Sequence, residues 1–167
     1  MLIFAYGSNM NLNRLTKRIP SAVKINNAFL PGHKLVCNKM SRDGSAKANI
    51  AKTDVPAELV WGVLFTIDNN EKPLLDKAEG LGKGYNEDTL TFFNETNNSY
   101  AAQTYIADSN SIDNTLLPYD WYKEFSVSGA IQNKLPAEYI IQLQSISCVR
   151  DHDEERRMKN YSILSGK

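Results

Sequence analysis

Cysteine and histidine, which often carry metal and redox chemistry, are scarce in this sequence. Its 167 residues include only two cysteines, Cys37 and Cys148, and two histidines, His33 and His152. These residues form neither a CxxC motif nor a disulfide framework, and no group of ligands has the spacing of a metal site. We therefore expect both cysteines to be reduced, buried packing residues in a cytosolic protein, and we expect no resident metal or cofactor.

The sequence also lacks an excess of charge of one sign and a long hydrophobic run. Lys and Arg together number 19, as do Asp and Glu, so the formal net charge is zero. We therefore expect neither a nucleic acid nor a membrane as a partner. The apolar opening at positions 1–5 is too short for a secretory signal or a membrane-spanning helix. These features predict a single soluble, cytoplasmic domain over residues 1–167.

Short apolar segments separated by turn residues fill the first two-thirds of the chain. They predict strands at 2–6, 24–29, 33–37, 48–52, 58–67, 85–93 and 100–106. Apolar residues at helical spacing predict helices at 11–18, 70–79, about 119–131, about 136–146 and 151–159, after which we expect the chain to fray. Because strands come first and helices last, we expect an α+β fold with a mostly antiparallel, curled sheet and helices packed on its outside.

The first predicted strand ends in the sequence YGSN at positions 6–9. Gly7 permits an unusual backbone turn, and Ser8 and Asn9 can form local hydrogen bonds. Consecutive backbone N–H groups in such a turn can bind an oxyanion or a carboxylate. The alternative is an ordinary strand-ending turn without a binding role.

Glu79 lies in the last turn of the helix predicted at 70–79, before the glycine-rich segment 80–84. A carboxylate is disfavoured at the C-terminal end of a helix, so we expect a raised pKa that suits a general base. The alternative is a solvated surface glutamate. The segment 80–84 does not match a phosphate-binding loop, because it follows a helix and lacks the required glycine spacing.

Two other groups could carry chemistry. Ser8 could act as a nucleophile, but it lacks a GxSxG motif, and only His33 and His152 could serve as its base. The acidic run at 151–155 could attract a divalent cation, although adjacent residues of a helix do not share a face. We therefore favour a solvated charged segment at 151–155 over a cation site. We also disfavour Ser8 as a nucleophile.

Several motifs, taken in order, resemble the gamma-glutamylcyclotransferase family of the AIG2-like fold group. They are FAYGSNM at 4–10, ANI at 48–50, VWGV at 60–63, LDKAEG at 75–80 with Tyr85, and LPAEY at 135–139 with Tyr122 and Leu143. The similarity covers about residues 2–150. Each motif alone is modestly specific, and the order of the set strengthens the resemblance.

The resemblance implies a small barrel-like sheet with flanking helices and an enzyme that needs no cofactor. It implies conversion of a gamma-glutamyl amino acid or amine into 5-oxoproline and a free amine, by attack of the glutamyl α-amine on its own γ-carbonyl. In this interpretation Glu79 is the acid and base. The residues that would hold the glutamyl group are Tyr6, Gly7, Ser8, Asn9, Met10 and Asn11, and Tyr122 would line the pocket.

Other interpretations stay open at this point. The same fold could serve as a non-catalytic module that binds a small molecule, although a binder would not need Glu79 as a base. The enzyme could also prefer gamma-glutamylamines or a gamma-glutamyl-protected biosynthetic intermediate. The glutathione-specific branch is disfavoured because it usually departs from YGSN at this loop. The expected partner is a small gamma-glutamyl molecule, and a homodimer is left open.

Overall fold

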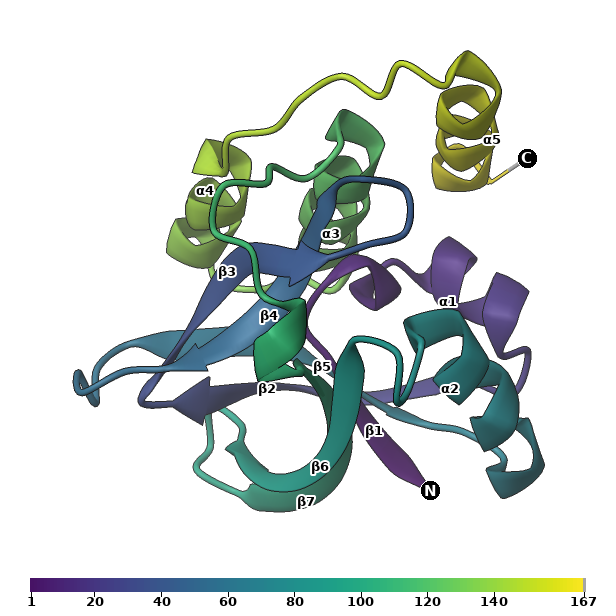
Figure 1. Cartoon of the computed structure of the whole chain (residues 1–167). Helices are drawn as coiled ribbons and strands as arrows, with labels where there is room; N and C mark the ends of the chain where they lie inside the picture. Colours follow the sequence, from purple (N-terminus) through teal and green to yellow (C-terminus); the bar gives the residue numbers. More distant parts are fainter. Residues whose placement is uncertain (167) are drawn as a thin grey trace.

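Five strands form a closed barrel in the computed structural model, which describes residues 1–166 (Figure 1). They are β1 (Leu2–Ala5), β2 (Val23–Pro31), β5 (Leu59–Thr66), β6 (Tyr85–Phe93) and β7 (Ser99–Ala107). Their order around the barrel is β1-β5-β2-β6-β7. The pairs are antiparallel except for β1 and β7, which run parallel where Ile3 meets Gln103. The predicted α+β fold with a curled, mostly antiparallel sheet is confirmed.

Strand β5 joins the two halves of the barrel because it pairs with both β1 and β2. Val60, Val63 and Leu64 are fully buried, as the nearly continuous apolar sequence of this strand predicts. The last pair between β1 and β5 joins Ala5 to Val63. The chain therefore leaves the barrel at residue 6, which places the following turn at the rim.

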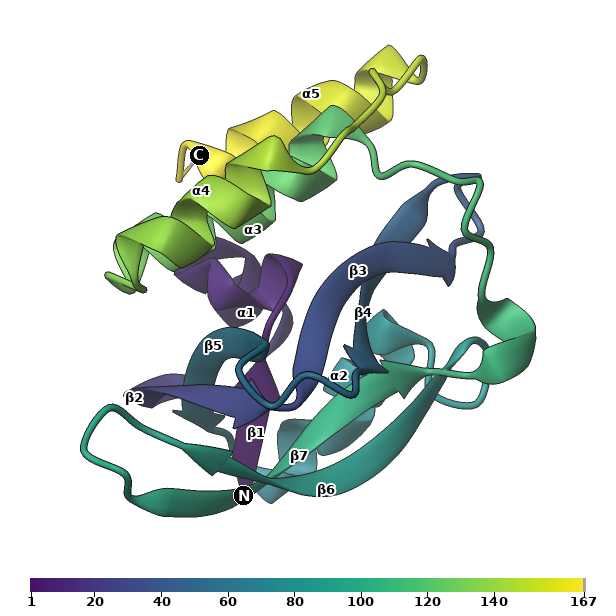
Figure 2. The same ribbon diagram turned by 90° about the vertical axis from the view of Figure 1, so that its left-hand side faces the viewer.

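A separate hairpin, made of β3 (His33–Met40) and β4 (Ala46–Lys52), stands between the barrel and the C-terminal helices (Figure 2). The amide side chain of Asn49 fixes it to the barrel, because its Oδ1 accepts a hydrogen bond of 3.0 Å from the backbone N–H of Ala107. This contact brings Ala48 to the same end of the barrel as the turn after β1.

The helices occupy two sides of the molecule. Helices α1 (Leu12–Arg18) and α2 (Lys72–Glu79) lie together beside the barrel in Figure 1. Helices α3 (Asp120–Gln132), α4 (Ala137–Ser145) and α5 (Glu154–Leu164) form a layer at the other side of the hairpin in Figure 2. The structure has a helix near each of the five predicted positions, although the bounds of α5 differ from the prediction. None of the helices described over residues 1–166 is long and apolar enough to cross a membrane.

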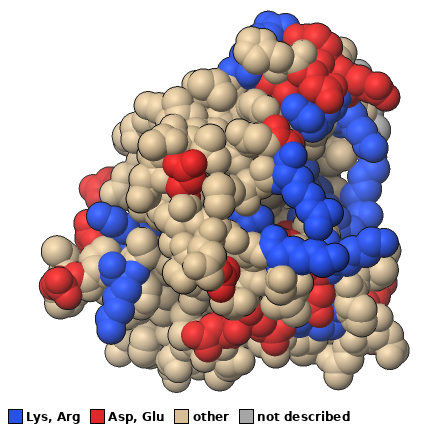
Figure 3. Space-filling model, in the orientation of Figure 1, with Lys and Arg blue, Asp and Glu red and all other residues tan. Residues whose placement is uncertain are grey.

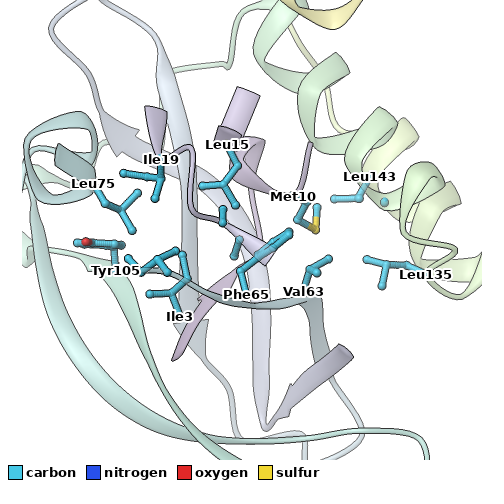
Figure 4. Packing of buried hydrophobic residues seen from close by; sticks show 14 of the residues in the cluster. Ile3, Met10, Leu15, Ile19, Val63, Phe65, Leu75, Tyr105, Leu135 and Leu143 are labelled. Carbon is cyan, nitrogen blue, oxygen red and sulfur yellow. The ribbon is translucent and has the colours of Figure 1, made fainter. Parts of the chain in front are cut away.

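A hydrophobic core joins the turn after β1 and helices α1 and α2 to the barrel (Figure 4). Met10 and Leu15 are fully buried, and Leu75 of α2 packs into the same cluster as Phe65 of β5. Residues four apart on a helix share a face, so the burial of Leu75 directs Glu79 toward the barrel. The core thus sets the position of two segments that lie far apart in the sequence.

Two local expectations were wrong. The C-terminal helix does not begin at residue 151 or fray after residue 159. It begins at Glu154 and continues as α5 to Leu164, and it is capped by Asp153, whose side chain accepts a hydrogen bond from the backbone N–H of Arg156. Cys148 is exposed rather than buried, because it lies in the exposed segment between α4 and α5. Cys37 is partly buried on β3.

Candidate active site

The turn after β1 presents backbone N–H groups at the rim of the barrel. Residues Ser8–Met10 form a single 3₁₀ turn, η1, in which the N–H of Met10 donates to the carbonyl of Gly7 at 3.0 Å. The N–H groups of Ser8 and Asn9 begin this turn, where helical geometry supplies no acceptor, and no acceptor is found for them among residues 1–166. These donors are available to an oxyanion or a carboxylate.

Gly7 is required by the close approach of two other segments to this turn. A Cβ atom at residue 7 would lie 3.0 Å from Cβ of Ala48 and 3.1 Å from the hydroxyl of Tyr122. Ala48 and Tyr122 are themselves joined, because the backbone N–H of Ala48 donates to the Tyr122 hydroxyl at 3.0 Å. Only a glycine lets the turn pack against this pair without displacing it.

Beneath the turn is a recess walled by tyrosines. The lining residues include Tyr6, Gly7, Ser8, Asn9, Ala48, Leu75, Glu79, Tyr85, Tyr105 and Tyr122. The Tyr6 hydroxyl donates to the Tyr105 carbonyl at 2.5 Å, and the Tyr85 hydroxyl donates to the Ala48 carbonyl. Burial raises the pKa of Tyr6, Tyr85 and Tyr122 above the usual value, so these phenols remain neutral donors or acceptors at physiological pH.

Glu79 faces this recess and has one fixed and one free carboxylate oxygen. Its Oε1 accepts hydrogen bonds of 2.9 Å from Nδ2 of Asn9 and 2.8 Å from Nη1 of Arg18. The same Arg18 nitrogen also donates to Oδ1 of Asn9 at 2.8 Å, which closes a three-residue network. No residue within 1–166 donates a hydrogen bond to Oε2 of Glu79. That oxygen is free to accept a proton from a bound molecule.

The end of α2 holds the Glu79 backbone in place. Gly80 adopts the left-handed conformation with φ of 74°, and its N–H donates to the carbonyl of Asp76 at 2.8 Å. Because the side chain of Glu79 is only 18 % exposed, it is not the solvated surface glutamate of the alternative interpretation. The structure therefore brings Glu79 and the turn at 6–9 to one recess across 70 residues of sequence.

Met10 and Asn11 do not line this recess, although the resemblance placed them in the binding loop. Met10 is fully buried in the core and packs under α3. Asn11 is also fully buried and caps α1, since its Oδ1 accepts a hydrogen bond of 3.0 Å from the N–H of Arg14. Its Nδ2 donates to the hydroxyl of Ser128 at 3.0 Å. Both residues therefore anchor the turn in the protein interior.

Comparison with known proteins shows to which family the chain belongs. The model of the AIG2-like family matches residues 59–143. The chain is 32 % identical over 150 residues to a gamma-glutamylcyclotransferase of Bos taurus, covering 87 % of this chain and 78 % of that protein. The chain belongs to the AIG2-like family. It is also 31 % identical over 151 residues to the gamma-glutamylcyclotransferase of Mus musculus, with the same coverage of both chains.

A solved structure supports the same assignment of the AIG2-like fold over the whole chain. A structure titled gamma-glutamyl cyclotransferase superposes with a TM-score of 0.80 at 26 % sequence identity. The alignment covers 99 % of this chain and 98 % of the other. The likeness therefore includes the barrel, the hairpin and the C-terminal helices.

Arg18 is the member of this AIG2-like site that the sequence did not reveal. It lies in the last turn of α1, where basic residues are common for reasons of helix electrostatics alone. Its side chain reaches Glu79 across 61 residues of sequence. Tyr105 also lines the recess, and no sequence motif singled it out. No local pattern marks either residue, because both contacts arise from packing between distant elements.

The acidic run at 151–155 has a structural part in this AIG2-like chain. The side chain of Asp151 is inaccessible to solvent and binds Arg156, with Oδ1 2.5 Å from Nη2. Its Oδ2 also accepts a hydrogen bond of 2.7 Å from the indole N–H of Trp121. These hydrogen bonds, chiefly those from Arg156, lower the pKa of Asp151 to about 2. The carboxylate is thus committed to fixing α5 against α3.

Proposed function

We propose that this protein is a gamma-glutamylcyclotransferase, which releases an amine from a gamma-glutamyl compound and forms 5-oxoproline. The observation that carries the proposal is the position of Glu79, with Oε1 fixed by Arg18 and Asn9 and Oε2 free. Ser8 and Asn9 line the same recess, and their N–H groups have no acceptor among residues 1–166. A base and an oxyanion site must both lie near one reacting carbon, and this recess supplies both.

The reaction needs no nucleophile from the protein, because the substrate carries its own. The glutamyl α-amine attacks the γ-carbonyl carbon, a carbon–nitrogen bond closes the five-membered ring, and the bond to the leaving amine breaks. An intramolecular attack of this kind can lower the barrier by about 7–11 kcal/mol when the reactive conformer is held. The tyrosine walls and the turn at 6–9 would hold that conformer.

Proton transfer is the part that requires Glu79. The pKa of an α-ammonium group is ordinarily about 7.7–8.0, so most of it is protonated and unreactive at neutral pH. The free Oε2 of Glu79 would take this proton and return it to the leaving amine, and it would then take the second proton that the ring nitrogen loses as the lactam forms. The backbone N–H groups of Ser8 and Asn9 would stabilise the tetrahedral oxyanion, where one donor is typically worth about 2.7–4 kcal/mol.

The proposal is tested by replacing Glu79 with an isostere that cannot accept a proton. The purified protein should form 5-oxoproline from gamma-glutamyl-alanine, and Glu79→Gln should lower kcat by roughly 10²–10⁴-fold. Calorimetry should still detect binding of the substrate to Glu79→Gln, because the turn at 6–9 is unchanged.

Ser8→Ala is the matched control, since the proposed donor at this position is the backbone N–H and not the hydroxyl. It should retain most of the activity. Loss of activity in Ser8→Ala together with an active Glu79→Gln would replace this proposal with a serine nucleophile. Absence of 5-oxoproline from every gamma-glutamyl compound tested, with binding retained, would favour the non-catalytic module.

A further inference from the structure

A second recess adjoins the first and is lined by basic side chains. It lies between the β3–β4 hairpin and the end of α2, and we call it the basic recess. Four of its lining residues are cations, Lys39, Arg42, Lys77 and Lys83. Figure 3 shows Lys and Arg side chains gathered around a hollow on the face that carries α1, α2 and the tip of the hairpin.

The acidic residues of the basic recess are already engaged elsewhere. Asp76 binds Lys72 and accepts a hydrogen bond of 2.6 Å from the hydroxyl of Tyr105, and Glu79 binds Arg18. Among the ion pairs of residues 1–166, none includes any of the four cations that line the recess. The recess therefore has an excess of positive charge within a protein of zero net charge.

Lys39 is the most informative of these cations because it is only 7 % exposed. Its ammonium group lies 4.6 Å from the ring centroid of Tyr85, and its terminal carbon packs against the backbone of Gly84. Burial lowers the pKa of Lys39, while the nearby Glu79 opposes this effect. The ammonium group itself is not among the buried unpartnered atoms of residues 1–166, so it opens into the recess without an ionic partner. Partial burial of a charge without such a partner is costly. A bound anion would remove that cost.

Glu79 connects the two recesses, because it lines both. In the proposed function the glutamyl half of the substrate occupies the tyrosine-walled recess, and Glu79 returns a proton to the leaving amine. The leaving amine must then lie beside Glu79, and the rest of the leaving group extends toward Lys39 and Arg42. The basic recess is thus placed to recognise the group that is released.

We propose that the released group is an acidic amino acid, so that the substrate is a gamma-glutamyl compound whose leaving half carries two carboxylates. This inference rests on the proposed function. A neutral amine would leave the buried Lys39 without an anion, and a neutral amino acid would offer one carboxylate to four cations. A dicarboxylic leaving group satisfies Lys39 and also reaches the exposed cations at the mouth. Its preference over neutral compounds falls as salt screens these charges.

The test compares leaving groups of increasing negative charge on one glutamyl scaffold. Gamma-glutamyl-ethylamide, gamma-glutamyl-alanine and gamma-glutamyl-glutamate release groups with no, one and two carboxylates. We expect kcat/KM to rise in that order, by roughly tenfold or more for each charge-assisted contact that is gained. Raising the salt concentration should reduce the difference between the first and the last compound.

Lys39→Met tests the residue while keeping the length of the side chain. It should reduce the ratio of kcat/KM for gamma-glutamyl-glutamate to that for gamma-glutamyl-ethylamide by at least about tenfold. Lys52→Met is the matched control, because it removes an exposed charge from the same hairpin outside the recess, and it should leave the ratio unchanged. If Lys39→Met does not fold, the order of kcat/KM for the three substrates with the unmodified protein still tests the proposal.

The outcomes distinguish this inference from the proposed function. Turnover of the ethylamide as efficient as that of the glutamate compound would overturn the acidic leaving group and leave the cyclotransferase intact. An unchanged ratio in a folded Lys39→Met would also overturn the role of Lys39. Failure of all three compounds to yield 5-oxoproline would instead reject the proposed function, and this inference with it.

Discussion

Three side chains from different parts of the chain form a hydrogen-bonded network at the centre of the candidate site. Nη1 of Arg18 donates to both Oδ1 of Asn9 and Oε1 of Glu79, and Nδ2 of Asn9 donates to the same Oε1. The network fixes Oε1 and leaves Oε2 without a donor among residues 1–166. In the proposed function Arg18 is therefore a positioning residue, since it acts through Glu79.

Removing the Arg18 guanidinium should misplace the carboxylate without unfolding the protein. We expect Arg18→Met to lower kcat by roughly 10- to 100-fold, because small errors in the position of a catalytic group carry large penalties. KM should change much less, since the turn at 6–9 remains. Steady-state kinetics with gamma-glutamyl-alanine would measure the two effects separately.

Arg18→Lys is the conservative partner of that variant, because an ammonium group can still donate to both Asn9 and Glu79. It should recover part of the lost kcat. Equal losses in Arg18→Lys and Arg18→Met, with a matching rise in KM, would indicate that Arg18 binds substrate and does not position Glu79.

At the scale of elements, α5 is attached to the rest of the molecule by charged contacts as well as by apolar packing. Tyr161, Ile163 and Leu164 are partly buried against the hydrophobic core. The helix adds two ion pairs, because Arg156 binds Asp151 and Arg157 binds Asp120 at 2.7 Å. Charge-assisted hydrogen bonds contribute about 1.5–3 kcal/mol each when well formed. The helix should therefore respond to pH more than the barrel does.

Asp151→Asn should destabilise the protein by about 1–3 kcal/mol at neutral pH, because the Arg156 guanidinium loses its charged partner. The folded pKa of Asp151 is about 2, below the unfolded value of about 3.9. Its contribution to the free energy of unfolding is thus present above about pH 4 and is lost as the pH falls toward 2. Urea unfolding at pH 7, 4 and 3 should show the difference between the two proteins narrowing with acid.

Glu154→Gln is the control for this pH series. Its partner Arg150 and its own side chain are both more than half exposed, so the stability change should be small. A difference between the unmodified protein and Asp151→Asn that stays constant down to pH 3 would contradict the assigned role of the Asp151–Arg156 pair.

At the scale of the whole molecule, the reactivity of the two cysteine thiols reports whether the protein is folded. Burial raises the pKa of the Cys37 thiol to about 12, so almost none of it is a thiolate at pH 8. Cys148 is exposed in the segment before α5. A thiol-specific reagent should therefore modify one cysteine rapidly and the second only when the protein unfolds. Cys148→Ser should abolish the fast phase, and a fast phase that persists would show that Cys37 is accessible in the folded state.

Local chemistry in the sequence determined most elements of this protein. The apolar segment 58–67 predicted the central strand β5, and Gly80 marked the end of the helix that carries Glu79. The YGSN turn and Glu79 could be selected as site residues because a strand end and a helix end restrict the backbone in known ways. The end of α5 was misjudged because the charged stretch 151–159 gave no reason to continue the helix, whereas it runs to Leu164 and stops before Gly166, which adopts the left-handed conformation with φ of 74°.

Only the tertiary structure decided which selected residues meet and which additional ones join them. Closure of the barrel between β1 and β7 and packing of Leu75 into the core bring Glu79 to the turn at 6–9. The same packing sends Asn11 into a helix cap, brings Arg18 to Glu79 and buries Lys39 over Tyr85. These contacts join residues as far apart as Ile3 and Gln103, so their geometry depends on how whole elements pack and leaves no periodic pattern along the chain.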